Sequence, residues 1–278
     1  MKKSKDLVLI TGCGSGIGMA LAQAFHAKGH TVCATARRAD SIAELATDNL
    51  LVRALDVTDA GGIDTLLKGL REDGYGVATL INNAGYGAMG PVMDIPAGEW
   101  QRQFDVNLFA PMALTRAVLP DMVARGRGLV VNISSVSGVV ATPFAAPYCA
   151  SKAALNAASD SLRMELKPLG VRVVTVQPGG IQSSFGLSAA SQVSLGDTSP
   201  YQAIRDGVLA RANDSQTRAM SAQTFARLLV EALPRSECPA VIRLGEKSRL
   251  LPRLKWLLPT RRLDSILSRR YQLDRLAS

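Results

Sequence analysis

A tyrosine and a lysine four residues apart, Tyr148 and Lys152, form the pattern in this sequence best suited to proton transfer. On a helix, residues with this spacing lie on one face, one turn from each other. An ammonium beside a phenol favours the phenolate, because opposite charges stabilise the ionised form. Ser135 follows an apolar run at residues 129–133, which is typical of a strand, and its hydroxyl could donate to a substrate oxygen. Together these residues predict proton transfer to or from a carbonyl or alcohol oxygen.

A glycine-rich loop near the N-terminus predicts the cofactor site that such chemistry needs. Residues 7–10 are an apolar strand pattern, residues 19–28 a helical pattern and residues 31–36 a second strand pattern. This unit of about 30 residues is the context that a dinucleotide-binding fingerprint requires. Glycines let the backbone approach a pyrophosphate, whose charge lies at the helix N-terminus. The loop residues expected to contact the cofactor are Gly12, Gly14, Ser15, Gly16, Ile17 and Gly18.

The end of the second strand indicates which dinucleotide binds. A carboxylate at this position would hold the ribose 2′-hydroxyl and repel a 2′-phosphate. Here Arg37 and Arg38 follow Ala36 instead, and no acidic residue occurs before Asp40. Arginine pairs with phosphate through two parallel hydrogen bonds, so we expect NADP(H). The alternative is that both arginines are solvated residues at the start of a helix.

Strand and helix patterns alternate over most of the remaining chain, which predicts an α/β fold with a doubly wound parallel sheet in a single domain. Further strands are expected at residues 50–55, 78–81, 129–133, 171–176 and 240–244, and helices at residues 60–73, 96–124, 148–167 and 222–233. Pro111 should bend the helix at 96–124 or remove one of its hydrogen bonds. Ligands in such sheets bind outside the strand carboxyl ends. Residues following these ends include Arg37, Asp56, Asn83, Ser135 and Pro178.

Length and composition narrow the class of protein. With 278 residues, 47% of them apolar, the chain can bury one large core and is not disordered. No apolar run reaches the ~18 residues of a membrane span. The apolar residues 7–10 after the N-terminal lysines are fewer than the ~7–15 of a signal peptide, so we expect a cytoplasmic protein. The four cysteines have neither metal-ligand spacing nor a paired framework, and we expect reduced thiols and no metal site.

Taken in order, these motifs resemble those of the short-chain dehydrogenase/reductase family over roughly residues 5–184. The resemblance implies a Rossmann-like fold. The glycine spacing is that of the family's shorter oxidoreductases, and the sequence is similar to steroid- and retinoid-active members. The matching motifs are Thr-Gly-x-x-x-Gly-x-Gly at residues 11–18, Asn-Asn-Ala-Gly at residues 82–85, Asn107, Ser135, Tyr148, Lys152, Pro178-Gly179 and Ser183.

The resemblance also implies a role for each catalytic residue. Tyr148 would be the general acid in reduction and the base in oxidation, and Ser135 would orient the carbonyl oxygen. Lys152 would hold the nicotinamide ribose hydroxyls and stabilise the phenolate. Asn107 would keep a water that connects Lys152 to solvent, while hydride passes between the nicotinamide and the carbonyl carbon. Further cofactor contacts are expected from Asp56, Val57, Asn83, Ala84, Gly85, Tyr148, Lys152, Pro178, Gly179, Ile181 and Ser183.

The stretch from residue 173 to residue 196 contains no charged residue, and this absence of charge indicates the class of substrate. In this fold the segment would close over the substrate as a lid. An apolar lid favours an uncharged, lipophilic ketone, aldehyde or secondary alcohol, because an ion would lose its solvation there. Met89, Phe144 and Phe185 are the expected pocket walls. The alternative is that the segment is apolar because it packs on the body.

A basic extension follows the last strand. We expect a catalytic domain at residues 1–245 and a helical extension at residues 246–278; from Arg243 onward there are ten Lys/Arg and three Asp/Glu. A helical pattern at 260–276 places Leu263, Ile266, Leu267 and Tyr271 on one face. We expect this face to pack on the body or across a subunit interface. A basic amphipathic segment with a tryptophan could instead lie on an anionic membrane surface.

The sequence thus predicts an NADP(H)-dependent oxidoreductase that acts on a small molecule and forms a homo-oligomer. It has no recognition module for nucleic acid. Two alternatives are a non-catalytic NADP(H)-binding sensor and a membrane-recruited protein that retains the fold. An intact set of Ser135, Tyr148 and Lys152 argues against the sensor, which needs no proton donor.

Overall fold

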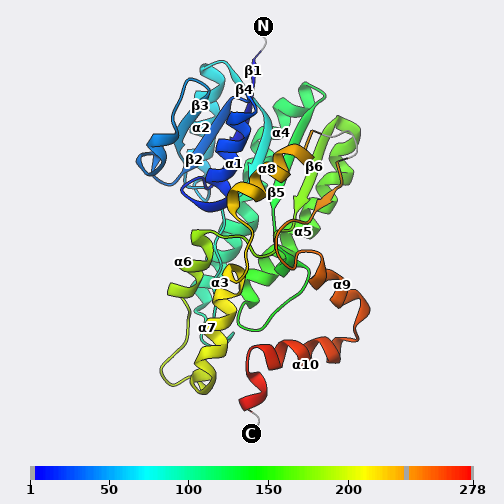
Figure 1. Ribbon diagram of the computed structural model, residues 1–278. Helices are drawn as coiled ribbons and strands as arrows, with labels where there is room; N and C mark the ends of the chain where they lie inside the picture. The colour runs from blue at the N-terminus through cyan, green and yellow to red at the C-terminus, as the bar shows by residue number, and fades with distance from the viewer. Residues whose placement is uncertain (1–3, 235–237, 277–278) are drawn as a thin grey trace.

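A seven-stranded parallel sheet forms the centre of the computed structural model, which describes residues 4–234 and 238–276 (Figure 1). The strand order is β3-β2-β1-β4-β5-β6-β7, so the direction of winding reverses between β1 and β4. The strands are β1 (Lys5–Ile10), β2 (Val32–Ala36), β3 (Leu50–Ala54), β4 (Tyr75–Asn82), β5 (Gly128–Ile133), β6 (Val171–Val176) and β7 (Val241–Ile242). The prediction of a doubly wound parallel sheet is confirmed.

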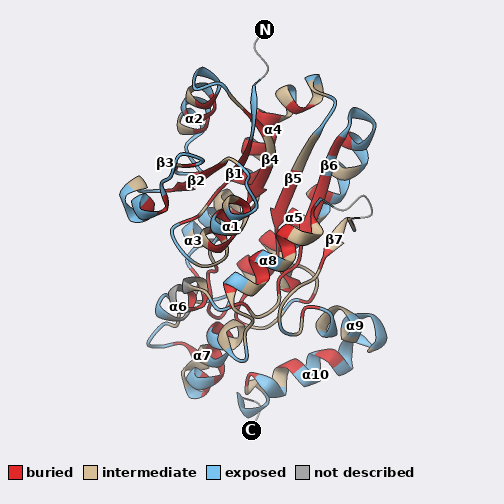
Figure 2. Cartoon of the chain, turned by 45° about the horizontal axis from the view of Figure 1, so that its top comes forward, coloured by how far each residue is buried: buried red, intermediate tan, exposed pale blue. Residues whose placement is uncertain are grey.

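Helices cover both faces of the sheet, because its strands are apolar on both sides. Leu9 and Ile10 are consecutive and therefore point to opposite faces, where each joins a separate buried cluster. The Ile10 cluster includes α1 (Gly16–Ala27) and α8 (Ala222–Ala232). The Leu9 cluster includes α2 (Ala60–Glu72), α4 (Ala110–Ala124) and the end of α5 (Ala146–Leu166). Figure 2 shows the buried residues concentrated in the sheet and on the inward helix faces.

The single helix expected at residues 96–124 is two helices joined by a wider turn. α3 (Ala97–Phe104) leads into the π-helical segment Asp105–Phe109, in which the Ala110 N–H donates to the Asp105 carbonyl, and α4 follows. Pro111 lies in the first turn of α4. Because proline has no N–H, it cannot bond the carbonyl four residues earlier, which belongs to Asn107. The irregularity expected at Pro111 therefore occurs in the preceding turn, around Asn107.

Several short helices, α3 among them, lie beyond the carboxyl ends of the strands (Figure 1). Two of them, α6 (Ser184–Ser191) and α7 (Arg205–Asn213), were not predicted from the sequence. The C-terminal extension contains α9 (Leu250–Leu257) and α10 (Thr260–Arg270). In residues 4–234 and 238–276, every helix is too short or too polar to cross a membrane.

The extension packs on α7 through one side of α10. Leu263, Leu267 and Tyr271 are buried in one cluster with Ile204 and Val208. The Tyr271 hydroxyl also donates to Asp214 at 3.3 Å, and Arg270 pairs with the same carboxylate. Two features differ from the expectation of a single apolar face. In α10 and at its C-terminal end the buried residues are 263, 267 and 271, which are spaced four apart on one side of the helix, and Ile266 lies outside this stripe and is 50% exposed. In α9 the side chains of Leu250, Trp256 and Leu257 are exposed.

Replacing Leu267 by alanine tests this packing. Leu267 is 8% exposed, so its removal should lower the free energy of unfolding by about 2–4 kcal/mol. The neighbouring Ile266→Ala variant is the matched control and should change stability by less than about 0.5 kcal/mol. Denaturation with urea measures both. Equal effects of the two substitutions would show that α10 does not pack in this way.

Candidate active site

The loop between β1 and α1 is shaped by positive backbone φ angles at Gly12 and Gly16, +73° and +57°. Side chains other than hydrogen rarely tolerate these angles. A Cβ at Gly12 would lie 2.8 Å from the Ala84 Cα, and one at Gly16 would lie 2.8 Å from the Ser183 Cβ. The glycine loop is therefore in close contact with the segments that follow β4 and β6. All three segments were predicted from the sequence to contact the cofactor.

Asn83 ties the glycine loop to the end of β4. Its side-chain amide donates to the carbonyls of Thr11 at 2.8 Å and Gly12 at 3.1 Å. The Thr11 hydroxyl in turn accepts from the backbone N–H groups of Asn83 and Ala84 at 3.1 and 3.0 Å. Gly18 lies against the Gly12 carbonyl and the Asn83 amide, so a side chain there would clash. The side chain of Asn83 thus holds the loop in place.

The charged residues predicted to select the cofactor lie at the ends of β2 and β3. Arg37 and Arg38 follow β2 and are exposed. Asp56 follows β3, and its carboxylate accepts from the Thr58 N–H at 2.9 Å and the Thr58 hydroxyl at 2.7 Å. These bonds, and more weakly the charges of Arg37 and Arg102, hold the pKa of Asp56 below its usual range. Val57 is buried beside it.

Ser135 and Tyr148 are brought together at the end of β5. Ser135 begins the turn Val136–Gly138, and its hydroxyl accepts from the Ser137 N–H at 3.0 Å. Tyr148 lies in the first turn of α5, which begins two residues earlier than expected. Burial raises the pKa of the Tyr148 hydroxyl, and a hydrogen bond with Ser135 and the charge of Arg211 oppose this rise. The two side chains thus form a buried hydroxyl pair suited to holding one substrate oxygen.

Lys152 lies one turn after Tyr148 and points to the sheet. Its ammonium donates to the Ile133 carbonyl at 2.9 Å, and burial lowers its pKa to about 8. The sequence analysis expected the charge of Lys152 to lower the pKa of Tyr148. That role stays a prediction: Ser135 and Arg211 favour the Tyr148 phenolate in the structure, while burial acts against the charged forms of both Tyr148 and Lys152.

The buried ammonium of Lys152 makes stability depend on pH. Its pKa falls from 10.5 to about 8 on folding, so its burial destabilises the protein below pH 8, and this cost disappears as the pH rises toward 10.5. Lys152→Met should therefore raise the free energy of unfolding at pH 7. Removing the buried charge should stabilise the protein by about 3 kcal/mol, and losing the hydrogen bond to the Ile133 carbonyl should offset ~1 kcal/mol of this gain. Near pH 10 the gain should vanish.

Urea denaturation at pH 7 and pH 10 measures this prediction. Exposed Lys167 in the same region of the chain provides the control, since Lys167→Met should change stability by less than about 0.5 kcal/mol at both pH values. A Lys152→Met variant that is less stable than the unmodified protein at pH 7 would contradict the prediction.

Asn107 uses its side chain to hold the backbone after β4. Its amide donates to the Tyr86 carbonyl and the Ser151 hydroxyl, both at 3.1 Å, and its oxygen accepts from the Tyr86 N–H at 3.2 Å. Gly85 lies between Asn107 and Lys152: a Cβ there would be 3.0 Å from the Asn107 Oδ1 and 3.5 Å from the Lys152 Nζ. The structure therefore brings Asn107 close to Lys152, and the implied role of Asn107 in holding a water stays a prediction.

Gln103 is a positioning residue that the sequence analysis missed. It is fully buried; its oxygen accepts from the Ala88 N–H and its amide donates to the Tyr86 carbonyl, both at 2.7 Å. Gln103 and Asn107 thus fix the same segment. Their spacing of four residues on one helical pattern was the available signal.

The segment after β6 closes the other side of the site. The Pro178 carbonyl accepts from the Val136 N–H at 3.0 Å, which links it to the turn that carries Ser135. Gly179 donates to the Leu244 carbonyl at 2.9 Å, and Ile181 is buried. Ser183 precedes α6 and touches the glycine loop, as described above.

Two of the three predicted substrate residues lie beside Tyr148. Met89 and Phe185 belong to the same apolar cluster as Tyr148, and the rings of Phe185 and Tyr148 are 5.4 Å apart at 48°. α6 thus covers the tyrosine in the manner of a lid. Phe144 is not brought there: it lies in the cluster beneath α10, where its ring meets Tyr201 edge-on at 5.6 Å. Its contact with the C-terminal extension was not readable from the sequence.

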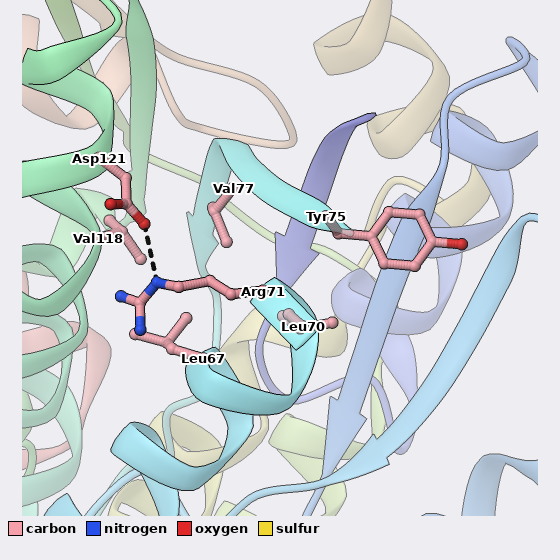
Figure 3. A pocket seen from close by; sticks show the side chains of 7 residues that line it. All are labelled: Leu67, Leu70, Arg71, Tyr75, Val77, Val118 and Asp121. Carbon is pink, nitrogen blue, oxygen red and sulfur yellow. Dashed lines mark hydrogen bonds and ion pairs between the residues drawn. The ribbon is translucent and has the colours of Figure 1, made fainter. Parts of the chain in front are cut away.

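A second concave region lies far from these residues, between α2 and α4 (Figure 3). Tyr75 and Val77, at the start of β4, place it near the strand amino ends. Arg71 and Asp121 form an ion pair across it at 3.0 Å. Its remaining lining residues, Leu67, Leu70 and Val118, are apolar. This region contains no proton donor paired with a base and is a feature of helix packing.

Comparisons with known proteins indicate the family of the chain. The sequence profile of a family described as "short chain dehydrogenase" matches residues 6–193. The NADPH-dependent 1-acyldihydroxyacetone phosphate reductase of Schizosaccharomyces pombe is 35% identical over 216 residues, which cover 76% of this chain and 73% of that protein. Among solved structures, a short-chain dehydrogenase from Streptomyces avermitilis has a TM-score of 0.79 at 30% identity and covers 98% of both chains. A 4-hydroxyisoleucine dehydrogenase complexed with NADH has a TM-score of 0.71 at 27% identity and covers 86% of this chain and 97% of its own.

Proposed function

The chain belongs to the short-chain dehydrogenase/reductase family, and from this premise we propose that it is an NADP(H)-dependent oxidoreductase for lipophilic ketones, aldehydes or secondary alcohols. The observation that carries the proposal is the buried pair of Ser135 and Tyr148 at the strand edge that also holds the glycine loop. Lys152 lies one turn behind the tyrosine. A site with these parts positions one carbonyl or alcohol oxygen and moves one proton.

The glycine loop fits a dinucleotide cofactor. A Cβ at Gly14 would have no neighbour nearer than the Ala36 Cβ at 4.0 Å, so backbone at this point is open to a ligand, whereas Gly12, Gly16 and Gly18 are enclosed by protein. The N-terminus of α1 follows directly and favours a phosphate group. When bound, the nicotinamide supplies or accepts the hydride.

NADP(H) is the proposed cofactor because of the charges at the end of β2. Arg37 and Arg38 are exposed there, and no carboxylate follows β2 directly that would repel a 2′-phosphate. The Schizosaccharomyces pombe relative is named as NADPH-dependent, which supports this choice. The similar 4-hydroxyisoleucine dehydrogenase is complexed with NADH, so the choice of NADP(H) depends on the two arginines.

The proposed roles of the catalytic residues follow from their positions. Ser135 donates to the substrate oxygen, and Tyr148 gives it a proton in reduction or takes one in oxidation. Lys152, with its pKa lowered to about 8, exchanges protons near neutral pH and holds the nicotinamide ribose. Asn107 and Gln103 keep the backbone after β4 in place beside Lys152.

A lipophilic substrate is proposed because the surroundings of Tyr148 are apolar. Met89, Ala145, Phe185 and Ala189 surround or cover its ring. The Schizosaccharomyces pombe relative is named for a ketone that bears both an acyl chain and a phosphate, so it supports a lipophilic chain on the substrate but not the absence of charge. Burying an ion against these side chains would be costly, so the reacting end of the substrate should be uncharged.

Two further proposals concern the whole protein. The division at residue 245 is kept as a proposal, with residues 1–245 as the catalytic domain and residues 246–278 as an extension, of which the described part packs on the body because α10 is buried against α7. The protein forms a homo-oligomer in the cytoplasm. Two apolar side chains are exposed on one face of the sheet: Phe109, which directly precedes α4, and Met164 in α5. They support a subunit interface on this face. Sedimentation of the purified protein tests the oligomer.

Turnover of a panel of lipophilic ketones and aldehydes, measured with NADPH and with NADH, tests the proposed function. We expect NADPH-dependent reduction of several members of the panel. Tight binding of NADPH without turnover of any of them, or of the corresponding alcohols with NADP⁺, would favour a nucleotide-binding sensor instead.

A further inference from the structure

Arg211 is a buried cation whose charge acts on Tyr148, and the proposed function above gives it no contact with the substrate. It belongs to α7 and is 6% exposed. Its Nε donates to the Thr142 hydroxyl at 2.6 Å, and that hydroxyl is 3.9 Å from the sulfur of Cys149, the residue after Tyr148. Ala212, the next residue of α7, is buried in the same cluster as Tyr148. The guanidinium is therefore anchored beside the first turn of α5.

The charge of Arg211 is only partly balanced by the protein. Among the residues that the structure describes, none accepts a hydrogen bond from its two terminal nitrogens. The carboxylate in its vicinity belongs to Asp214, which is also paired with Arg270 and, at 3.5 Å, with Lys247. The positive charge also acts on the Tyr148 hydroxyl, favouring its phenolate. The two terminal nitrogens of Arg211 are not among the buried side-chain atoms without a partner, so they are accessible to an anionic ligand.

We infer that Arg211 binds an acidic group of the substrate, a carboxylate or a phosphate, while the carbonyl lies at Ser135 and Tyr148. Arginine binds both kinds of group through two parallel hydrogen bonds. Thr142 orients the guanidinium through Nε and leaves the two terminal nitrogens for the ligand. This inference rests on the proposed function and deepens it: the substrate has an uncharged, lipophilic reacting end and an acidic end.

The inference departs from the expectation of a wholly uncharged substrate, which stays a prediction. That expectation came from the uncharged stretch at residues 173–196, and Arg211 lies outside this stretch. Only the folding of α7 against α6 and the first turn of α5 brings the guanidinium to the site. No spacing in the sequence connects Arg211 with Tyr148.

Matched pairs of substrates test the inference. The value of kcat/KM with NADPH is measured for oxo-alkanoates that differ in the number of carbons between the ketone and the carboxylate. Each acid is compared with its methyl ester, and phosphate-bearing ketones are measured as a second kind of acid. For the unmodified protein we expect kcat/KM to be about tenfold or more higher for the best acid than for its ester. Arg211→Gln should remove this preference mainly by raising KM for the acid, and Arg211→Lys should retain part of it.

Arg205→Gln is the control, since Arg205 is an exposed arginine on the same helix and its replacement makes the same change in net charge. It should keep the preference for acids. If Arg211→Gln lowers kcat/KM equally for acid and ester, Arg211 acts through Tyr148 and not on the substrate. If the unmodified protein has the same kcat/KM for acids and for their esters, the inference is wrong, whether or not the variants fold.

Binding measured by calorimetry separates failure of this inference from failure of the proposed function. A medium-chain oxo-carboxylate and its methyl ester are titrated into the NADP⁺ complex of the unmodified protein and of Arg211→Gln, because NADP⁺ has no hydride to transfer to a ketone. Tighter binding of the acid, lost in the variant, supports the acid site even if no ketone is reduced. Equal affinities for acid and ester overturn it, while NADPH-dependent reduction of neutral ketones would leave the proposed function intact.

Discussion

Tyr148→Phe is expected to lower turnover by about 10²-fold or more and to leave the affinity for NADPH nearly unchanged. The substitution removes only the hydroxyl that the proposed mechanism uses as proton donor. The ring keeps its contact with Phe185, 5.4 Å away, and its place in the apolar cluster with Met89. The fold and the closed position of α6 should therefore be retained.

Steady-state kinetics and a cofactor titration measure this prediction. Tyr201→Phe is the matched control, because Tyr201 also packs edge-on against a phenylalanine, Phe144, but lies in the cluster beneath α10. Its turnover should stay within a few-fold of that of the unmodified protein. Near-normal turnover of Tyr148→Phe would remove Tyr148 from the mechanism.

Arg37→Asp is expected to weaken NADPH binding by roughly 10- to 150-fold, which corresponds to the 1.5–3 kcal/mol of a charge-assisted hydrogen bond. Binding of NADH, which has no 2′-phosphate, should change far less. Arg37 is exposed at the end of β2, so the substitution should not disturb the core. The new carboxylate would also repel the phosphate and hold a ribose hydroxyl instead.

Dissociation constants for both cofactors measure the effect. Arg116→Asp, at an exposed position of α4, makes the same change in net charge away from the strand ends and should affect NADPH and NADH equally. Equal dissociation constants for the two cofactors in the unmodified protein would show that Arg37 and Arg38 do not select NADP(H).

The parts of this structure that could be predicted from the sequence depend on local patterns. Apolar strand patterns separated by helical ones predicted the parallel sheet, and its carboxyl edge gathers the glycine loop, Asn83, Ser135 and Tyr148 as expected. Each of these residues follows a strand or begins a helix, so its position along the chain places it at that edge. The π-helical turn around Asn107 was only partly predictable, because Pro111 signalled an irregularity but not its form.

The parts that could not be predicted depend on contacts between distant segments. α6 and α7 lie in a stretch without strong periodicity, and their contacts with Tyr148 and with α10 determine where Phe144 and Arg211 point. The predicted apolar face of α10 included Ile266, which fits the helical pattern but is exposed in the structure. Periodicity identifies a face of a helix, whereas only packing decides how wide the buried face is.

The transfer of deuterium from labelled NADPH to a ketone tests the central claim most directly. NADPH carrying deuterium at the transferable position of its nicotinamide is incubated with the protein and the best ketone of the panel, and the alcohol is analysed by mass spectrometry. The account predicts deuterium on the carbinol carbon of the product with the unmodified protein, and about 10²-fold less labelled product per unit time with Tyr148→Phe. NADPH that binds tightly yet leaves every ketone unlabelled and unreduced would contradict it.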